Sequence, residues 1–305
     1  MNQRFAAITD RRLGLEIECV VPVVGRGETR DVQELLVHLF RNQGMTAMAR
    51  PYCHSAVPSG VDLCIEHDSS LRGEQRYSGI VWGQIEVKTR PAGFRELEQL
   101  LPPALNIIRY VGARITPSCG LHVHHDLPEA VEYPWIVRNL MHFWWRFHKV
   151  IYGLVAPSRA SNSFCRPPRS EDATLFDNCR TYEQLCHRLT RCDRYAALNL
   201  TNLSDANRRT IEWRIHSGTT DWIKVKNWVL ATQRWTEHAI SRSCQYKAEP
   251  MANTRAGLNA LLVTTGLKPN SRIYCKVDKE LRMVGRYLLR RWRHFRAQQE
   301  GGADA

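Results

Sequence analysis

The sequence predicts an α+β fold, in which strands that carry polar side chains are interspersed with amphipathic helices. Apolar and polar residues alternate with the period of a strand over residues 13–21, 83–91, 119–125 and 210–218. Apolar residues recur at helical spacing over residues 31–42, 94–113, 135–155, 182–189, 221–239, 252–265 and 279–296. Two further strands are expected, one within residues 45–73 and one at residues 194–200.

Size and composition bound the class of protein. A chain of 305 residues with 43% hydrophobic residues can bury a substantial core, as one large domain or two modest ones. Its ten cysteines form no Cys-x-x-Cys pair, and residues 1–12 lack the apolar core of a signal peptide. We therefore expect a cytoplasmic protein. Residues 135–155 are long and apolar enough to resemble a membrane span, but Arg138, Arg146 and Lys149 interrupt them, so no span is expected.

Three local features refine the expected elements. Asp31 is placed to cap the start of the helix at residues 31–42, and Gly44 follows its end. Pro102 and Pro103 are expected to kink or divide the helix at residues 94–113. Residues 156–178 are rich in proline, serine and arginine and show no periodicity, which predicts a long exposed loop that could act as a lid.

The formal net charge of +13 would suit an anionic partner, because a positive potential raises the local concentration of anions. Much of this charge lies in the predicted C-terminal helix. Its arginines are Arg282, Arg286, Arg290, Arg291, Arg293 and Arg296. Such a run is either the solvated face of a helix or a binding site for an acidic partner.

Residues 119–125 read Cys-Gly-Leu-His-Val-His-His. In an extended strand His122 and His124 point to one face, while Val123 and His125 point to the other. A single histidine in a strand is usually a hydrogen-bonded core or surface residue. Two on one face favour metal or phosphate binding over packing.

Acidic residues occupy one face of two other predicted strands. Glu16 and Glu18 share a face of an otherwise apolar strand, and adjacent carboxylates there need a cation unless that face merely meets water. Glu86 offers a third carboxylate, although it could instead form an ion pair with Lys88 on the same face.

The last predicted strand carries an acid and an arginine on one face, Glu212 and Arg214, which could also belong to a cross-strand ladder of ion pairs. Together the strand faces offer carboxylates and imidazoles without a thiolate, which favours Mg²⁺ or Mn²⁺ over a structural zinc. A carboxylate-rich metal site beside arginines suits phosphate chemistry. The sequence contains no Gly-x-x-x-x-Gly-Lys-Ser/Thr motif, so a P-loop is not expected.

Five motifs occur in a specific order within residues 11–218. They are Gly14-Leu15-Glu16-Ile17-Glu18, Gly83-Gln84-Ile85-Glu86, Gly120-Leu121-His122-Val123-His124, Arg194 with Asn199, and Ile211-Glu212-Trp213-Arg214. In this order they resemble the glutamine synthetase and glutamate-cysteine ligase superfamily, and within it the amidoligases.

The resemblance implies a glutamine-synthetase-like catalytic domain over residues 1–305, with a curved antiparallel sheet and helices packed on its outer face. A basic helical extension would occupy about residues 277–297. The implied activity is that of an ATP-dependent carboxylate-amine ligase, which forms an amide or peptide-like bond through an acyl-phosphate. Its partners would be an amino-acid or peptide carboxylate and an amine, and its cofactors ATP and two or three Mg²⁺ (or Mn²⁺) ions.

The resemblance also assigns roles to residues. The implied metal ligands are Glu16, Glu18, Glu86, His122 and Glu212. His124 and Asn199 would lie near the nucleotide, and Arg194 and Arg214 would hold the phosphate and the acyl-phosphate. The base that deprotonates the amine has no match in the motifs, and the candidates are Asp68, Glu171 and Asp172. A separate N-terminal β-domain like that of glutamine synthetases is not found.

Two other classes of function stay open. A metal-dependent hydrolase would use the same histidines and acids to activate water, and it would form its product without a nucleotide. A nucleic-acid-binding protein would use the basic C-terminal helix, and its binding would depend strongly on salt and survive the loss of Glu16.

Overall fold

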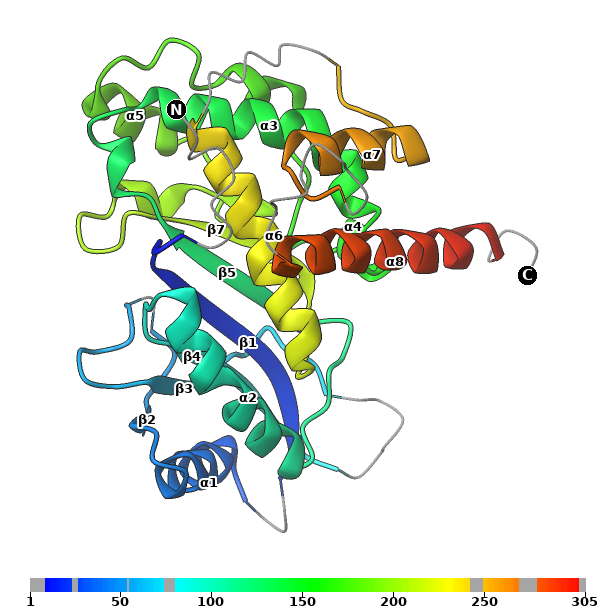
Figure 1. The fold of residues 1–305 in the computed structure, drawn as a ribbon. Coiled ribbons are helices and arrows are strands. Elements are labelled where there is room, and N and C mark those ends of the chain that lie inside the picture. Colours follow the sequence, from blue (N-terminus) through cyan, green and yellow to red (C-terminus); the bar gives the residue numbers. More distant parts are fainter. Residues whose placement is uncertain are drawn as a thin grey trace. The chain divides into compact units, whose positions relative to one another are not determined.

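The structure is a computed structural model, drawn as a ribbon in Figure 1. It describes residues 9–23, 27–53, 55–73, 80–241, 249–268 and 279–301. These residues form two compact units. The sheet unit comprises Asp10–His124 and His216–Lys226. The helical unit comprises Thr9, His125–Ile215 and the described residues from Asn227 onward.

Strands and helices are mixed along the chain, which confirms the α+β prediction. The strands are β1 (Leu13–Pro22), β2 (Ala47–Ala49), β3 (Leu63–His67), β4 (Trp82–Thr89), β5 (Gly120–Asp126), β6 (Leu198–Asn199) and β7 (Thr210–Ser217). The α-helices are α1 (Thr29–Asn42), α2 (Phe94–Tyr110), α3 (Trp135–Tyr152), α4 (Pro157–Ala160), α5 (Tyr182–Leu189), α6 (Trp222–Ser241), α7 (Arg255–Thr264) and α8 (Lys279–Gly301). Short 3₁₀ helices are η1 (Pro128–Ala130), η2 (Ser170–Thr174) and η3 (Thr201–Ser204).

The strands of the sheet unit lie in the order β2-β3-β4-β1-β5. β4 pairs antiparallel with both β1 and β3, whereas β2 pairs parallel with β3. The sheet is therefore mixed, and the expectation of a wholly antiparallel sheet is wrong at β2. The physical reason is the long connection at residues 50–62, which returns the chain to the starting end of the sheet and so allows a parallel pair.

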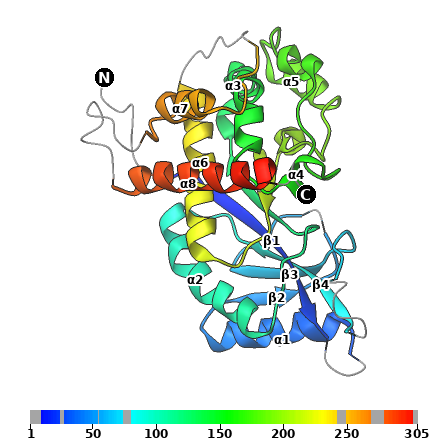
Figure 2. The same ribbon diagram turned by 90° about the vertical axis from the view of Figure 1, so that its right-hand side faces the viewer.

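Helices α1 and α2 lie beside the strands of the sheet unit (Figures 1 and 2). A Cβ added to Gly83 would lie 3.4 Å from Val32 of α1, so the odd-numbered residues of β4 face that helix. Ile85 and Val87 on this face are buried. Because strand side chains alternate, the even-numbered residues of β4 point to the opposite face. The charged residues described below belong to that second face.

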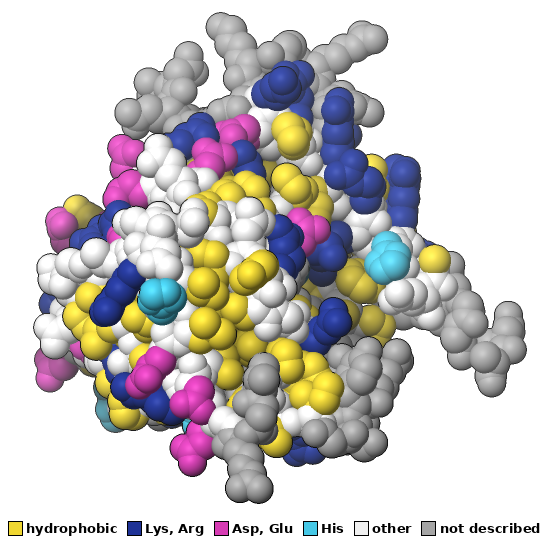
Figure 3. Space-filling model, turned by 90° about the horizontal axis from the view of Figure 1, so that it is seen from below, with side chains coloured by type: hydrophobic (Ala, Val, Ile, Leu, Met, Phe, Trp, Pro, Cys, Tyr) yellow, Lys and Arg dark blue, Asp and Glu magenta, His cyan; other side chains and the backbone are white. Residues whose placement is uncertain are grey.

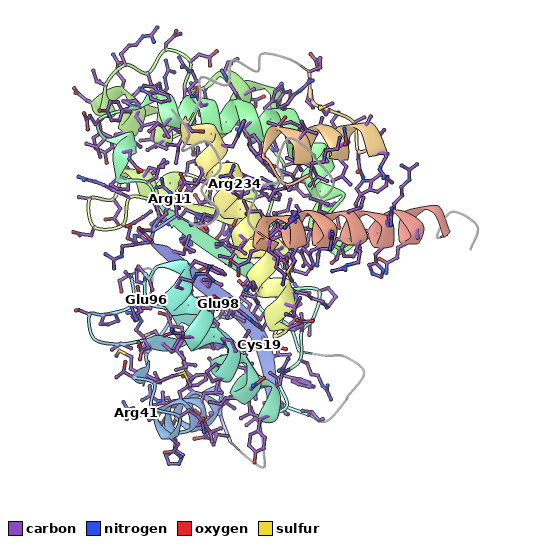
Figure 4. The ribbon with its side chains drawn as sticks, viewed as in Figure 1. Arg11, Cys19, Arg41, Glu96, Glu98 and Arg234 are labelled. Carbon is purple, nitrogen blue, oxygen red and sulfur yellow. The ribbon has the colours of Figure 1, made fainter. Side chains whose placement is uncertain are left out.

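Helix α2 is anchored through two glutamates that Figure 4 labels on it. Glu96 accepts a hydrogen bond of 2.9 Å from Arg90, and Glu98 forms an ion pair with Lys226 at the start of α6. These contacts join α2 to Arg90, which follows β4, and to Lys226 in α6. Because these ion pairs are partly exposed to solvent, each contributes little to the free energy of unfolding, and their main effect is to orient the helix.

Helix α1 differs from the expectation at its start, and helix α2 is not divided at its two prolines. α1 begins at Thr29, two residues before the expected cap, and Asp31 instead accepts a hydrogen bond of 2.7 Å from the Glu28 amide within a capping box. Gly44 follows its end with φ of 78°, as expected. α2 runs undivided through Pro102 and Pro103, because its apolar side is buried along its whole length and outweighs the lost hydrogen bonds.

The helical unit is built around α3 and α6. The helix expected at residues 135–155 is confirmed by α3, and α6 matches the helix expected at residues 221–239. Trp144, Trp213, Trp228 and Trp235 come together in its core, and their rings meet edge to face with centroids 5.4–5.5 Å apart. Among the described residues, no helix has the length and apolarity needed to cross a membrane.

Residues 156–178 do not form the long exposed loop that was expected. They contain α4 and η2, and Arg159, Cys165 and Phe176 are buried. Their prolines and serines hide the helical period, but three buried side chains hold the segment against the unit. The strand expected at residues 194–200 is shorter than predicted, since β6 covers only two residues.

Candidate functional site

Three carboxylates stand directly opposite one another across β3, β4 and β1. The antiparallel registers pair Glu66 with Glu86 and Glu86 with Glu18, and all three side chains are buried. We call these three residues the acidic row. Like charges placed directly opposite in a sheet repel, so the row needs compensating cations.

Two histidines of β5 extend this face of the sheet, because β5 is the next strand beside β1. His122 lies with one ring nitrogen 3.0 Å from a Glu16 oxygen and the other 3.5 Å from a Glu18 oxygen. His124 lies 3.3 Å from the second Glu16 oxygen. The expectation that His122 and His124 share a face is therefore met, and both reach the acids of β1.

A buried lysine lies among the acids. The Lys88 Nζ is 3.0 Å from Glu66, 3.0 Å from Glu86 and 3.7 Å from Glu16. Arg50 adds a second cation, with its Nε 2.7 Å from Glu66. The ion pair between Glu86 and Lys88 that was an alternative to metal binding does form, but Lys88 is shared among three carboxylates.

The surroundings shift three of these groups. Burial raises the pKa of Glu86 well above its ordinary value, and the charges of Glu16 and Glu18 add to this, while Lys88 opposes it. Burial alone would raise the pKa of Glu16, but His124, His122 and Lys88 together lower it well below its usual range. Burial alone would lower the pKa of Lys88, yet Glu16, Glu86 and Glu66 raise it, so this side chain stays an ammonium.

The donor set of this face fits a hard divalent cation. One ligand atom each from Glu18, Glu86 and His122 lies within 4.8 Å of the others, and all three residues are buried. Carboxylate oxygens with a single imidazole suit Mg²⁺ or Mn²⁺. A cation at this position would also relieve the repulsion that raises the pKa of Glu86.

Mn²⁺ affinity is expected to rise with pH. The pKa of Glu86 is raised, so protons compete with a metal ion for this carboxylate at low pH, and the competition fades as pH increases through that pKa. Mn²⁺ titrations in a series of buffers from acid to mildly alkaline pH would measure this, with proton release upon binding in the more acidic buffers. A flat affinity across this range would contradict the role given to Glu86.

The end of β7 approaches the site through a glycine. The Gly218 amide donates a hydrogen bond of 2.7 Å to the Cys119 carbonyl. A Cβ at Gly218 would lie 2.7 Å from the Cys119 Cβ and 3.0 Å from the Glu18 carbonyl oxygen. Glu18 belongs to β1 and Cys119 directly precedes β5, so a side chain at this position would push these two segments apart.

Gly218→Ala is expected to lower the free energy of unfolding by about 1–3 kcal/mol, because the backbone beside Glu18 and Cys119 must shift. Chemical denaturation would measure the loss. Gly14→Ala is the matched control, because its Cβ would meet only the His124 Cβ at an ordinary 3.8 Å. Equal stability of the two variants would show that the backbone absorbs the added methyl group.

A second polar group lies in the helical unit, on β6 and β7. Asn199 pairs with Glu212 in the strand register and donates a hydrogen bond of 2.8 Å to its carboxylate. Arg214 contacts the other Glu212 oxygen at 2.5 Å. The buried Arg159 of α4 donates a hydrogen bond of 2.7 Å to the Arg214 carbonyl and so fixes this strand. The structure thus brings Asn199, Glu212 and Arg214 together.

Other predicted site residues lie elsewhere. Arg194 is exposed, and its guanidinium lies over the Tyr195 ring at 5.2 Å. The candidate bases make local contacts: Asp68 accepts a hydrogen bond from the Ser70 amide in a turn, and Asp172 accepts one from the Arg169 amide. Glu171 is exposed and pairs with Arg169.

Sequence reasoning missed three residues that the structure places at these sites. Glu66 is a member of the acidic row, Arg50 forms an ion pair with Glu66, and Arg159 supports β7. A signal for Glu66 exists, because Cys64 and Glu66 share one face of a short strand just as Glu16 and Glu18 do. Arg50 and Arg159 lie outside the strands and carry no comparable pattern.

Helix α8 carries the predicted run of arginines on its exposed face. The exposed members are Arg282, Arg286, Arg290, Arg293 and Arg296. Basic side chains gather on the right of Figure 3, the side to which α8 extends in Figure 1. Arg291 differs from the others, since it is half buried and donates a hydrogen bond of 2.7 Å to the Leu154 carbonyl. Residues 277 and 278 of the expected extension lie outside the described residues.

Comparisons with known proteins add a family. Residues 9–236 match the model of a family described as "Putative amidoligase enzyme". No curated protein matches. Among solved structures, a bifunctional glutathione synthetase from Pasteurella multocida aligns with a TM-score of 0.45 and 12% identity, over 96% of this chain and 49% of that one. This chain therefore spans about half the length of that structure.

Proposed function

Since the chain belongs to the family of putative amidoligase enzymes, we propose that it is an ATP-dependent ligase that joins a carboxylate to an amine. The observation that carries the proposal is the group of Glu18, Glu86 and His122, buried and with ligand atoms within 4.8 Å of one another. This donor set suits a cation that accompanies a nucleoside triphosphate.

In the proposed reaction, an oxygen of the substrate carboxylate attacks the γ-phosphorus of ATP, and the bond to ADP breaks. The amine nitrogen then attacks the acyl carbon of the resulting acyl-phosphate, phosphate leaves, and the nitrogen gives up a proton. Bound Mg²⁺ or Mn²⁺ would neutralise phosphate oxygens. The carboxylate is proposed to belong to an amino acid or a peptide.

The residues of this chain take distinct roles in the proposal. In the sheet unit, Glu18, Glu86 and His122 would hold the divalent cation. Glu16 is a further ligand implied by the resemblance, and it lies 3.0 Å from His122 and 3.3 Å from His124. In the helical unit the implied ligand is Glu212, which Asn199 and Arg214 hold in place.

Phosphate binding is assigned to arginines. Arg214 is part buried and already aligned by Glu212, so it is preorganised for an anionic oxygen. Arg194 is exposed and would reach a substrate only from the surface, while His124 would lie near the nucleotide. These roles come from the family resemblance, and mutation of each residue tests them separately.

The test is ATP consumption in mixtures of amino acids and short peptides with Mg²⁺, with mass spectrometry to detect a condensed product. The proposal expects ADP, phosphate and an amide in equal amounts, and it expects no product when either the amine or the nucleotide is left out. Product formation without nucleotide would replace the ligase by a metal-dependent hydrolase.

A second proposal concerns the arginine face of α8, which we assign to an acidic peptide substrate or partner. Five exposed arginines on one helix face favour it. Binding of a fluorescent polyglutamate peptide is expected to weaken about tenfold or more between about 50 and 200 mM salt, and in Arg286→Glu/Arg290→Glu. Preferential binding of an oligonucleotide of equal charge would favour the nucleic-acid alternative instead.

A further inference from the structure

We infer that the ammonium of Lys88 occupies one cation position of the acidic row. The sheet unit therefore takes one divalent cation fewer than its carboxylates could otherwise bind. The inference rests on the proposed function only in that this face binds a divalent cation.

Glu66 and the neighbouring backbone hold Lys88 in place. Glu66 is fully buried and accepts contacts from Arg50 at 2.7 Å, Lys88 at 3.0 Å and the Cys53 amide at 3.0 Å. Lys88 also donates a hydrogen bond of 3.1 Å to the Cys53 carbonyl. With its oxygens engaged by these donors, Glu66 is a positioning residue for the ammonium and not a metal ligand.

Glu86 is shared between two cation positions. Its carboxylate contacts Lys88 at 3.0 Å, and it also belongs to the ligand group with Glu18 and His122. In sites with two metal ions, a bridging carboxylate commonly binds both ions, which lie about 3.5–4 Å apart. A lysine ammonium is a compact point charge, so it can fill the place of one such ion.

The net charge of this face matches the charge of one divalent ion. The face contains four carboxylates, those of Glu16, Glu18, Glu66 and Glu86, and two cations, Lys88 and Arg50. Counted formally, the four carboxylates exceed the two cationic side chains by two negative charges. A single Mg²⁺ or Mn²⁺ would neutralise this excess of negative charge. Without the ammonium of Lys88 the excess would be larger, and a further cation could be bound.

The experiment measures Mn²⁺ stoichiometry by electron paramagnetic resonance, and affinity by calorimetry, on the nucleotide-free full chain. Lys88→Met keeps the length of the side chain but removes its charge. We expect this variant to bind one more Mn²⁺ per chain than the wild type. Lys88→Arg is expected to keep the wild-type stoichiometry, because it keeps the charge.

Lys224→Met is the matched control, since Lys224 is an exposed lysine of the same unit, and it is expected to leave Mn²⁺ binding unchanged. Lys88→Met could fold poorly, so thermal unfolding gives a second readout. Millimolar Mn²⁺ should raise its melting temperature by several degrees more than that of the wild type. In Lys88→Met/Glu66→Gln, which keeps the net charge of the wild type, this excess should shrink.

Two results overturn the inference. One is an equal number of Mn²⁺ ions in wild type and Lys88→Met, and the other is equal stabilisation of the two by Mn²⁺. Either result would mean that Lys88 only forms ion pairs with the carboxylates and does not take the place of a metal ion. A wild type that binds no Mn²⁺ at all would instead remove the proposed metal site, so failure of the proposed function is seen separately.

Discussion

Glu86→Gln is expected to abolish measurable Mn²⁺ binding to the sheet unit and to lower ATP consumption by about 10²–10³-fold. The carboxylate of Glu86 is part of the ligand group with Glu18 and His122, and glutamine keeps its shape but not its charge. Calorimetry and a coupled ADP assay would measure the two effects. His122→Ala should reduce both to a similar extent.

Glu86→Gln is expected to lose function without losing stability. Burial raises the pKa of Glu86, and the charges of Glu16 and Glu18 add to this, so a neutral glutamine should not lower the stability of the metal-free protein. Glu96→Gln, on the exposed start of α2, is the control and should keep full activity. Wild-type turnover by Glu86→Gln would remove the ligase mechanism proposed for this site.

Trp213→Ala is expected to lower the free energy of unfolding of the helical unit by about 3–5 kcal/mol. Trp213 is fully buried, its ring lies between those of Trp144 and Trp235, and its indole nitrogen donates a hydrogen bond of 3.2 Å to Thr236. Removing the indole ring leaves a cavity and removes the hydrogen bond to the Thr236 hydroxyl. Denaturant titration followed by circular dichroism would measure the loss.

Trp135→Ala is the matched control in the same unit, because Trp135 lies at the exposed start of α3 and contacts only the Tyr133 ring among the aromatic pairs described. Trp135→Ala should lower the free energy of unfolding by less than about 1 kcal/mol. Comparable losses in both variants would mean that the tryptophan cluster repacks around the cavity. Since Trp213 lies between Glu212 and Arg214, the experiment also shows how far the polar face of β7 depends on the core behind it.

The acidic row destabilises its face of the sheet unless cations balance the charge of the carboxylates. Glu18, Glu86 and Glu66 stand in one line across three strands, where their repulsion is greatest. Apolar packing on the opposite face, through residues such as Ile85 and Val87, keeps the strands together despite this cost. Stability on one side of the sheet thus permits concentrated charge on the other.

The sequence could predict those features that depend on local periodicity. The alternation in β1, β4, β5 and β7 indicated correctly which side chains share a face, and helical spacing located α1, α3, α6 and α8. It could not predict the parallel pairing of β2 with β3 or the buried residues within residues 156–178, because these depend on where a connection folds back. The undivided α2 likewise depends on burial that outweighs two prolines.

The sequence by itself determined the kinds of ligand, since two acids or two imidazoles spaced by two residues must share a strand face. Only the tertiary structure decided which strands are neighbours and in what register. That register placed Glu66 opposite Glu86 and brought Lys88 within 3.7 Å of three carboxylates. The physical reason is that periodicity is a property of one strand, whereas charge balance arises between strands that are far apart in the chain.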